Sequence, residues 1–80
     1  MKTGKWHKIY KKFFSNLSWY TQATILLVNK KGYSIIQLKS IDNYKVVYCI
    51  NMEKCSYNKL SKLIEFYING DGYYYFLNIR

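Results

Sequence analysis

The sequence predicts a single small α+β domain, in the order α-β-β-β-α-β, whose four-stranded, mainly antiparallel sheet carries two helices on one face. The chain has 80 residues, which is the length of one domain. Half of its residues are apolar and a fifth are aromatic, which is too hydrophobic for a disordered chain. Apolar residues follow a helical period in two segments and form β-rich runs in the rest. We therefore treat residues 1–80 as one domain.

The first helical segment covers residues 5–17. Its apolar residues recur at three- and four-residue steps: Trp6, Ile9, Tyr10, Phe13 and Leu17. Its lysines lie away from that stripe: Lys5, Lys8, Lys11 and Lys12. This spacing predicts a basic amphipathic helix whose lysines face solvent or an anionic partner.

A meander of three strands is predicted over residues 23–51. Its strands are the runs rich in β-branched, aliphatic and aromatic residues: 23–28, 33–41 and 44–51. Asn29-Lys30-Lys31-Gly32 has the composition of a hairpin turn closed by glycine, and Asp42-Asn43 has that of a second turn.

A second helix is predicted over residues 56–68, followed by a last strand over 73–79. Ser56 is a favourable N-cap, and Asn69-Gly70 is a favourable helix end. The expected buried stripe of this helix recurs at helical spacing: Leu60, Leu63, Ile64 and Tyr67.

Side chains alternate along a strand, so each strand residue can be assigned to one face of the sheet. The face expected to pack against the helices is mostly apolar: Ile36, Leu38, Tyr44, Val46, Tyr48, Ile50, Tyr75, Leu77 and Ile79. The face expected to remain open mixes aromatic, aliphatic and cationic residues: Tyr33, Ile35, Gln37, Lys39, Lys45, Val47, Cys49, Tyr74, Phe76, Asn78 and Arg80. A register shift of one residue would exchange the two sets in a strand.

The charge balance indicates the class of partner. The chain has 13 Lys+Arg against 4 Asp+Glu, a formal net charge of +9. A genome rich in A and T would supply lysine codons, but it would supply glutamate codons as well, so the shortage of acids indicates selection. A surface of this potential attracts polyanions or an acidic protein surface, and its binding depends on salt.

Residues for catalysis, metal binding and membrane insertion are scarce. The four carboxylates have no paired spacing, and His7 is the only histidine, so we expect a non-enzymatic protein without a metal or cofactor. Cys49 and Cys55 are expected to be reduced thiols of a cytoplasmic protein. The uncharged stretch 13–29 holds too many polar residues for a membrane span, so no membrane partner is expected.

These features predict a protein that binds nucleic acid or a nucleic-acid-processing complex through the basic helix and the open sheet face. The candidate binding residues are Lys5, Lys8, Lys11, Lys12, Lys30, Lys31, Tyr33, Lys39, Lys45, Tyr74, Phe76 and Arg80. A bacteriophage or another mobile element of a low-GC host would suit this composition. The alternative is a protein-level inhibitor of a host defence nuclease, of the anti-CRISPR or anti-restriction type, that docks directly on the enzyme. The aromatic residues of the open face are also compatible with a homodimer interface.

Overall fold

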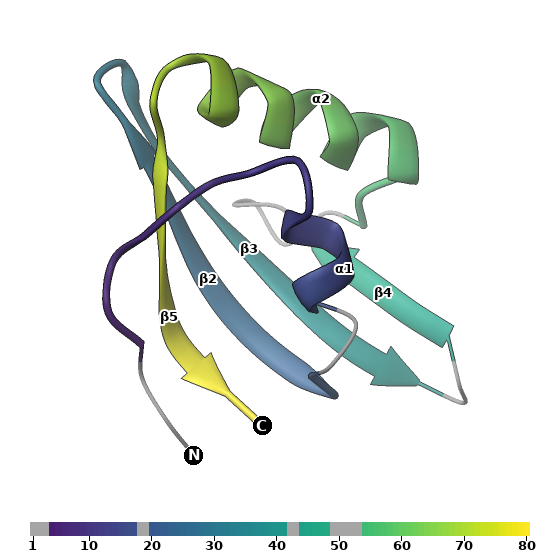
Figure 1. The fold of residues 1–80 in the computed structure, drawn as a ribbon. Coiled ribbons are helices and arrows are strands. Elements are labelled where there is room, and N and C mark those ends of the chain that lie inside the picture. The colour runs from purple at the N-terminus through teal and green to yellow at the C-terminus, as the bar shows by residue number, and fades with distance from the viewer. Residues whose placement is uncertain (1–3, 18–19, 42–43, 49–53) are drawn as a thin grey trace.

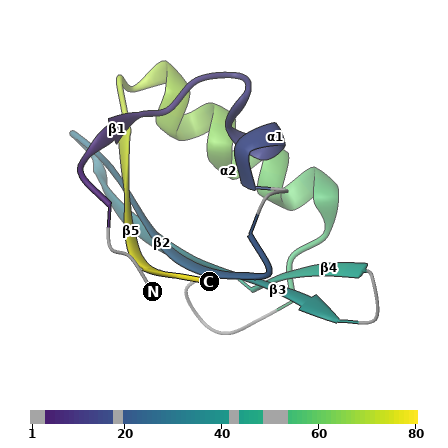
Figure 2. The same ribbon diagram turned by 60° about the horizontal axis from the view of Figure 1, so that its bottom comes forward.

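The computed structural model describes residues 4–17, 20–41, 44–48 and 54–80, without the side chains of Phe14, Lys45 and Tyr48. Within these residues, five strands form one antiparallel sheet, in the order β1 (His7–Lys8), β5 (Tyr73–Ile79), β2 (Gln22–Asn29), β3 (Gly32–Ile41) and β4 (Tyr44–Tyr48). Both helices, α1 (Phe13–Leu17) and α2 (Tyr57–Asn69), lie on the same face of this curved sheet (Figures 1 and 2). The predicted α+β class and the one-sided helices are therefore confirmed, whereas the element order and the strand number differ.

The longest regular part of the sheet is the hairpin of β2 (Gln22–Asn29) and β3 (Gly32–Ile41). Its register runs without interruption from Gln22↔Lys39 to Asn29↔Gly32. At the tip, Oδ1 of Asn29 accepts hydrogen bonds from the backbone N–H groups of Lys31, at 2.9 Å, and Gly32, at 3.1 Å. The amide oxygen thereby satisfies two backbone donors in the turn, which confirms the turn predicted over these residues.

The strand β4 (Tyr44–Tyr48) pairs with β3, and the chain then passes through α2 (Tyr57–Asn69) to β5 (Tyr73–Ile79). The helix begins as predicted, because Oγ of Ser56 accepts a hydrogen bond from the N–H of Lys59 at 3.2 Å. β5 does not join β4. It lies between β1 and β2 and is antiparallel to both.

The predicted basic helix over residues 5–17 is wrong. Residues 4–12, which we call the N-terminal strap, are mainly extended and include the short strand β1 (His7–Lys8), and only α1 (Phe13–Leu17) is helical. The N–H of Gly4 donates to the carbonyl of Phe76 at 3.3 Å, and the N–H of Ile9 donates to that of Gly72 at 3.1 Å. The strap thus satisfies backbone groups along β5 that would otherwise form an open sheet edge, and this tertiary pairing outweighs the helical spacing of the side chains.

The hydrophobic core lies between the sheet and the helices. Its buried members come from the strap, both helices and three strands: Ile9, Phe13, Leu17, Ala23, Ile25, Leu27, Ile36, Leu38, Leu60, Ile64, Tyr67 and Phe76. The predicted stripe of the second helix is confirmed, because Leu60, Ile64 and Tyr67 are buried and Leu63 is half-buried against them.

The predicted faces are correct for β3 and wrong for the described residues of β4 and for most of β5. In β4, Val47 rather than Val46 packs against the core, opposite Leu38. In β5, Phe76 is buried and Tyr74 packs against the core, although both were assigned to the open face. The phase of β5 also changes within the strand, because its pairing with β2 shifts between Thr24 and Ile25, so Ile79 packs on the helix-covered face as predicted.

The expectation of reduced thiols is wrong for Cys55, which is disulfide-bonded. The N–H of Cys55 donates to the carbonyl of Val47 at 2.7 Å, so the chain returns to the end of β4 before α2 begins. Cys49, the other cysteine of the sequence, lies outside the described residues.

Candidate functional site: the open face of the sheet

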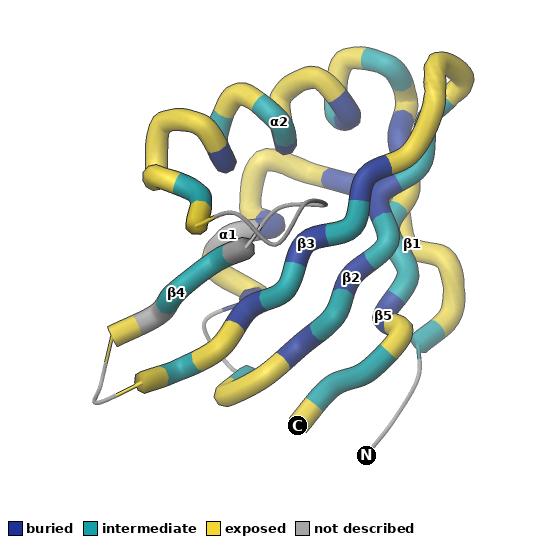
Figure 3. The backbone as a smooth tube through the Cα atoms, turned by 180° about the vertical axis from the view of Figure 1, so that it is seen from behind, coloured by how far each residue is buried: buried dark blue, intermediate teal, exposed yellow. Residues whose placement is uncertain are grey.

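The face of the sheet that the helices leave uncovered carries rows of side chains that cross the strands. Residues directly opposite one another on neighbouring strands share a face, so the register defines each row. The row nearest the β2–β3 turn, which we call the tip row, consists of Tyr73, Val28 and Tyr33, with Lys8 beyond Tyr73 at the sheet edge. Figure 3 views the molecule from this uncovered side, with β3, β2 and β5 in front.

The next row consists of Tyr75 on β5, Leu26 on β2 and Ile35 on β3. The strap extends this row, because the ring of Trp6 packs against that of Tyr75 with centroids 5.2 Å apart and an interplanar angle of 43°. The strap therefore contributes to both faces of the sheet: Trp6 lies beside Tyr75, while Ile9 enters the core.

Several large side chains of the open face remain in contact with solvent. Tyr33 is 63% exposed, Tyr73 is 46% exposed, and Tyr44 at the far end of the sheet is 75% exposed. Ile41 lies opposite Tyr44 and is also exposed. Exposed aromatic groups that gather on one face usually mark an interaction site, because burying them against a partner is favourable.

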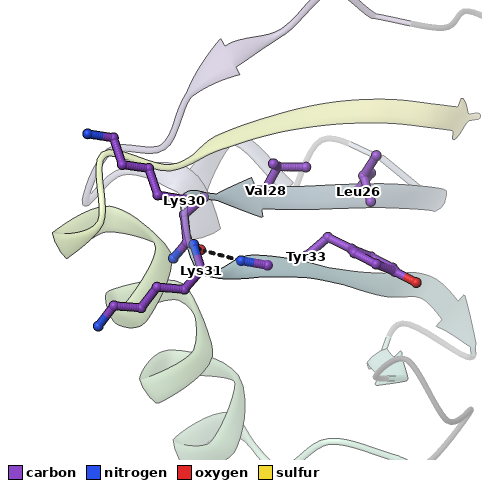
Figure 4. A pocket seen from close by; sticks show the side chains of 7 residues that line it. Leu26, Val28, Lys30, Lys31 and Tyr33 are labelled. Atoms are coloured by element: carbon purple, nitrogen blue, oxygen red, sulfur yellow. Dashed lines mark hydrogen bonds between the residues drawn. The ribbon is translucent and has the colours of Figure 1, made fainter.

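A depression of about 560 Å³ lies on this face at the turn between β2 and β3. Its lining residues are Leu26, Val28, Asn29, Lys30, Lys31, Gly32 and Tyr33. Figure 4 shows the side chains of Leu26 and Val28 on β2 beside the ring of Tyr33 on β3, with Lys30 and Lys31 extending from the tip in different directions. The depression therefore combines an aliphatic floor, an aromatic wall and a cationic rim.

The charged residues within the strands of the sheet are all lysines. None of the five described strands contains Asp or Glu. Lys30 and Lys39 are exposed, whereas Nζ of Lys8 lies 3.5 Å from Oδ1 of Asp71. Nζ of Lys31 lies 5.8 Å from the centroid of the Phe66 ring on α2, so this lysine is directed toward the helix layer. Lys30 therefore takes part in neither the ion pair with Asp71 nor the contact with the Phe66 ring.

The structure brings together part of the site predicted from the sequence. Tyr33, Lys30, Lys31 and Lys39 lie on or around the open face, with Lys8 at its edge. Lys5, Lys11 and Lys12 are exposed along the strap, which ends where α1 begins at Phe13. Arg80 follows β5, where its carbonyl accepts a hydrogen bond from the N–H of Thr21 at 3.0 Å. The side chain of Lys45 lies outside the described part of the chain.

Tyr74 and Phe76 belong to the helix-covered side, so their assignment to the open face is corrected. The ring of Tyr74 contacts those of Phe13, at 4.7 Å between centroids, and Phe76, at 5.5 Å. Burial raises the pKa of the Tyr74 hydroxyl above its ordinary value, with a smaller contribution from Tyr20. His7 stacks on Tyr74 with centroids 5.2 Å apart, so the one histidine is part of an aromatic cluster on the helix-covered side.

Sequence reasoning missed much of the open face, including Trp6, Leu26, Val28, Ile41, Tyr44, Tyr73 and Tyr75. No sequence signal identifies Tyr73 and Tyr75, because aromatic residues occupy both phases of the last strand and only the structure shows that Tyr74 and Phe76 face inward. For Leu26 and Val28 no such signal exists, because the run 23–28 is apolar or β-branched at every position and shows no alternation.

No group of three or more potential metal-ligating side chains occurs among the residues that the structure describes. In that same part of the chain, neither helix has the length and apolar composition needed to cross a membrane. Comparison with protein-family models, curated proteins and solved structures finds nothing that matches this chain. The geometry and charge of the open face are therefore the basis for a functional proposal.

Proposed function

We propose that this protein binds single-stranded nucleic acid on the open face of its sheet, as a non-enzymatic binding protein. The observation that carries the proposal is a set of exposed aromatic rings on a sheet face whose described strands contain no carboxylate. Unstacked bases pack on aromatic side chains of this kind, and the surrounding lysines attract the phosphate backbone.

Single strands suit this face better than a duplex does. The bases of a duplex are stacked inside it, so the rings of Tyr33 and Tyr73 would have no base face to contact. Stacking on a protein ring contributes about 1–3 kcal/mol per base and does not depend on base identity. The proposal therefore predicts binding with little sequence preference and with strong salt dependence.

A second copy of the chain is a less suitable occupant of the same face. Each copy carries a formal net charge of +9. Pairing two open faces would bring lysines such as Lys30 and Lys39 of both copies close together, and like charges facing one another oppose association. A polyanion removes this repulsion by supplying the compensating charge.

The proposal is tested by fluorescence anisotropy with labelled oligonucleotides of about 16 nucleotides, the upper site size of small single-strand binders. We expect the protein to bind oligo(dT) and oligo(U) more tightly than a DNA duplex of the same length. The logarithm of affinity should fall with the logarithm of salt concentration by about 0.7 for each phosphate contact. Equal or tighter binding of the duplex, or no binding at about 50 mM salt, would contradict the proposal.

The inhibitor alternative is distinguished by affinity purification from a low-GC bacterial lysate, with and without nuclease treatment. Direct nucleic-acid binding predicts that nuclease removes the co-purifying material. A single stoichiometric protein that survives nuclease treatment would instead identify the open face as a docking site for an acidic protein surface, and it would overturn the nucleic-acid proposal.

A further inference from the structure

We infer that the tip row is the principal nucleotide subsite of this face, with one base on Tyr33, a neighbouring base on Tyr73 and the intervening phosphate at Lys30. This inference rests on the proposed function and makes it specific. The bound nucleic acid would then cross the β-strands at the turn end of the sheet, with its phosphates along the rim.

The spacing of the two tyrosines supports two separate stacking positions. Tyr33 and Tyr73 lie opposite Val28 from either side, so they are two strand spacings apart. Neighbouring strands are about 4.8 Å apart, which places the two Cα positions about 10 Å from each other. Val28 fills the floor between them, so two rings stand on either side of a low aliphatic position.

The cation lies on the correct side of these rings. Lys30 follows Asn29 in the turn, two residues beyond Val28, and lines the same depression as Tyr33. Lys31 is directed toward the ring of Phe66, and Lys8 is ion-paired with Asp71. A phosphate at Lys30 would therefore lie outside the tip row, with its bases directed inward onto the rings.

The remaining rows of the open face present fewer exposed rings for bases to stack on. In the second row, the exposed ring of Trp6 packs against Tyr75, which is half-buried, and the other members are the aliphatic residues Leu26 and Ile35. At the far end, Tyr44 is highly exposed, but its partner across the strands is Ile41. Among the described residues, only the tip row presents two exposed rings beside a depression with a cationic rim.

The test compares Tyr33→Ala, Tyr73→Ala and Tyr44→Ala for binding to oligo(dT) and oligo(U). We expect each tip-row substitution to weaken binding about 5- to 150-fold, the equivalent of about 1–3 kcal/mol per stacked base. Tyr44→Ala is the comparison within the same face: it removes an exposed tyrosine outside the tip row, so it should weaken binding less than either tip-row substitution does. Thermal unfolding should show that all three variants still fold cooperatively, and Tyr33→Phe should retain binding because stacking does not need the hydroxyl.

The phosphate position is tested by Lys30→Gln against Lys62→Gln, which removes an exposed lysine of α2. Both substitutions lower the net charge equally. Only Lys30→Gln should reduce the salt slope, by about 0.7. Equal losses for Tyr33→Ala and Tyr44→Ala, or equal slopes for the two lysine variants, would overturn the subsite while leaving nucleic-acid binding intact. Absence of any binding by the parent protein would overturn both.

Discussion

The two faces of the β2–β3 hairpin have similar composition but differ in how far they are buried. On the helix-covered face, Ile25 lies opposite Ile36, and both are fully buried. On the open face, Val28 lies opposite Tyr33, which remains largely exposed. Packing in the core thus explains why Ile25 and Ile36 are apolar, but it does not explain the apolar character of Val28 and Tyr33. The strands therefore carry more apolar surface than the fold buries, and this surplus is what a ligand can bury.

The largest expected effect distinguishes the two faces within one strand. Phe76→Ala removes a buried ring of β5 and should reduce the free energy of unfolding by about 3–5 kcal/mol. Tyr73→Ala, on the open face of the same strand, should reduce it by no more than about 1 kcal/mol, the range of strand propensities. Urea unfolding followed by circular dichroism measures both. Similar losses for the two variants would mean that the open face contributes to folding as much as the core does.

A second prediction distinguishes the strap from the helix that the sequence indicates. Ile9 is buried, so Ile9→Ala should cost about 2–5 kcal/mol. Tyr10 belongs to the apolar stripe of the predicted helix but is exposed in the strap, so Tyr10→Ala should change stability by no more than about 0.5 kcal/mol. Urea unfolding distinguishes the strap from the predicted helix, because in an N-terminal helix both substitutions would lower the free energy of unfolding.

The smallest expected effect concerns the edge of the open face. Asp71→Asn removes the partner of Lys8, and because that ion pair is exposed, stability should change by less than about 1 kcal/mol. Asn is the suitable replacement because Asp71 has a φ of 51°, which Asn tolerates. The substitution also releases a lysine beside the tip row, so affinity for oligo(dT) at low salt should rise. Unchanged affinity would place Lys8 outside the path of the bound strand.

The sequence predicted correctly those features that depend on contacts between residues close together in the chain. The turn at Asn29 and the N-cap at Ser56 were predictable because each forms hydrogen bonds with backbone groups within three residues. The span of β5 was also predictable. Its inward face was not, because Tyr73-Tyr74-Tyr75 has no alternation and the register with β2 shifts between Thr24 and Ile25.

The N-terminal segment could not be predicted from its own residues. Ile9, Phe13 and Leu17 are buried as the helical period requires, but Trp6 and Tyr10 of the same stripe are exposed. Repulsion among closely spaced lysines weakens a helix here, and the edge of β5 offers backbone partners that only the complete fold supplies. For the candidate site, the sequence therefore indicated the open face, Tyr33 and the turn lysines, and it missed the residues that β5 and the strap contribute.

The position of β5 between the strap and β2 has a consequence for the speed and order of folding. The β2–β3 hairpin closes over a two-residue turn, an event of about 1–10 μs for isolated hairpins. Pairing Lys8 with Tyr73 instead joins segments from opposite ends of the described chain, and such non-local contacts slow folding. Before β5 pairs with β2, the backbone groups at one edge of β2 lack their partners, and the side chains of Ile25 and Leu27 are not fully buried. We therefore expect refolding yield to fall with protein concentration even where the native protein stays monodisperse.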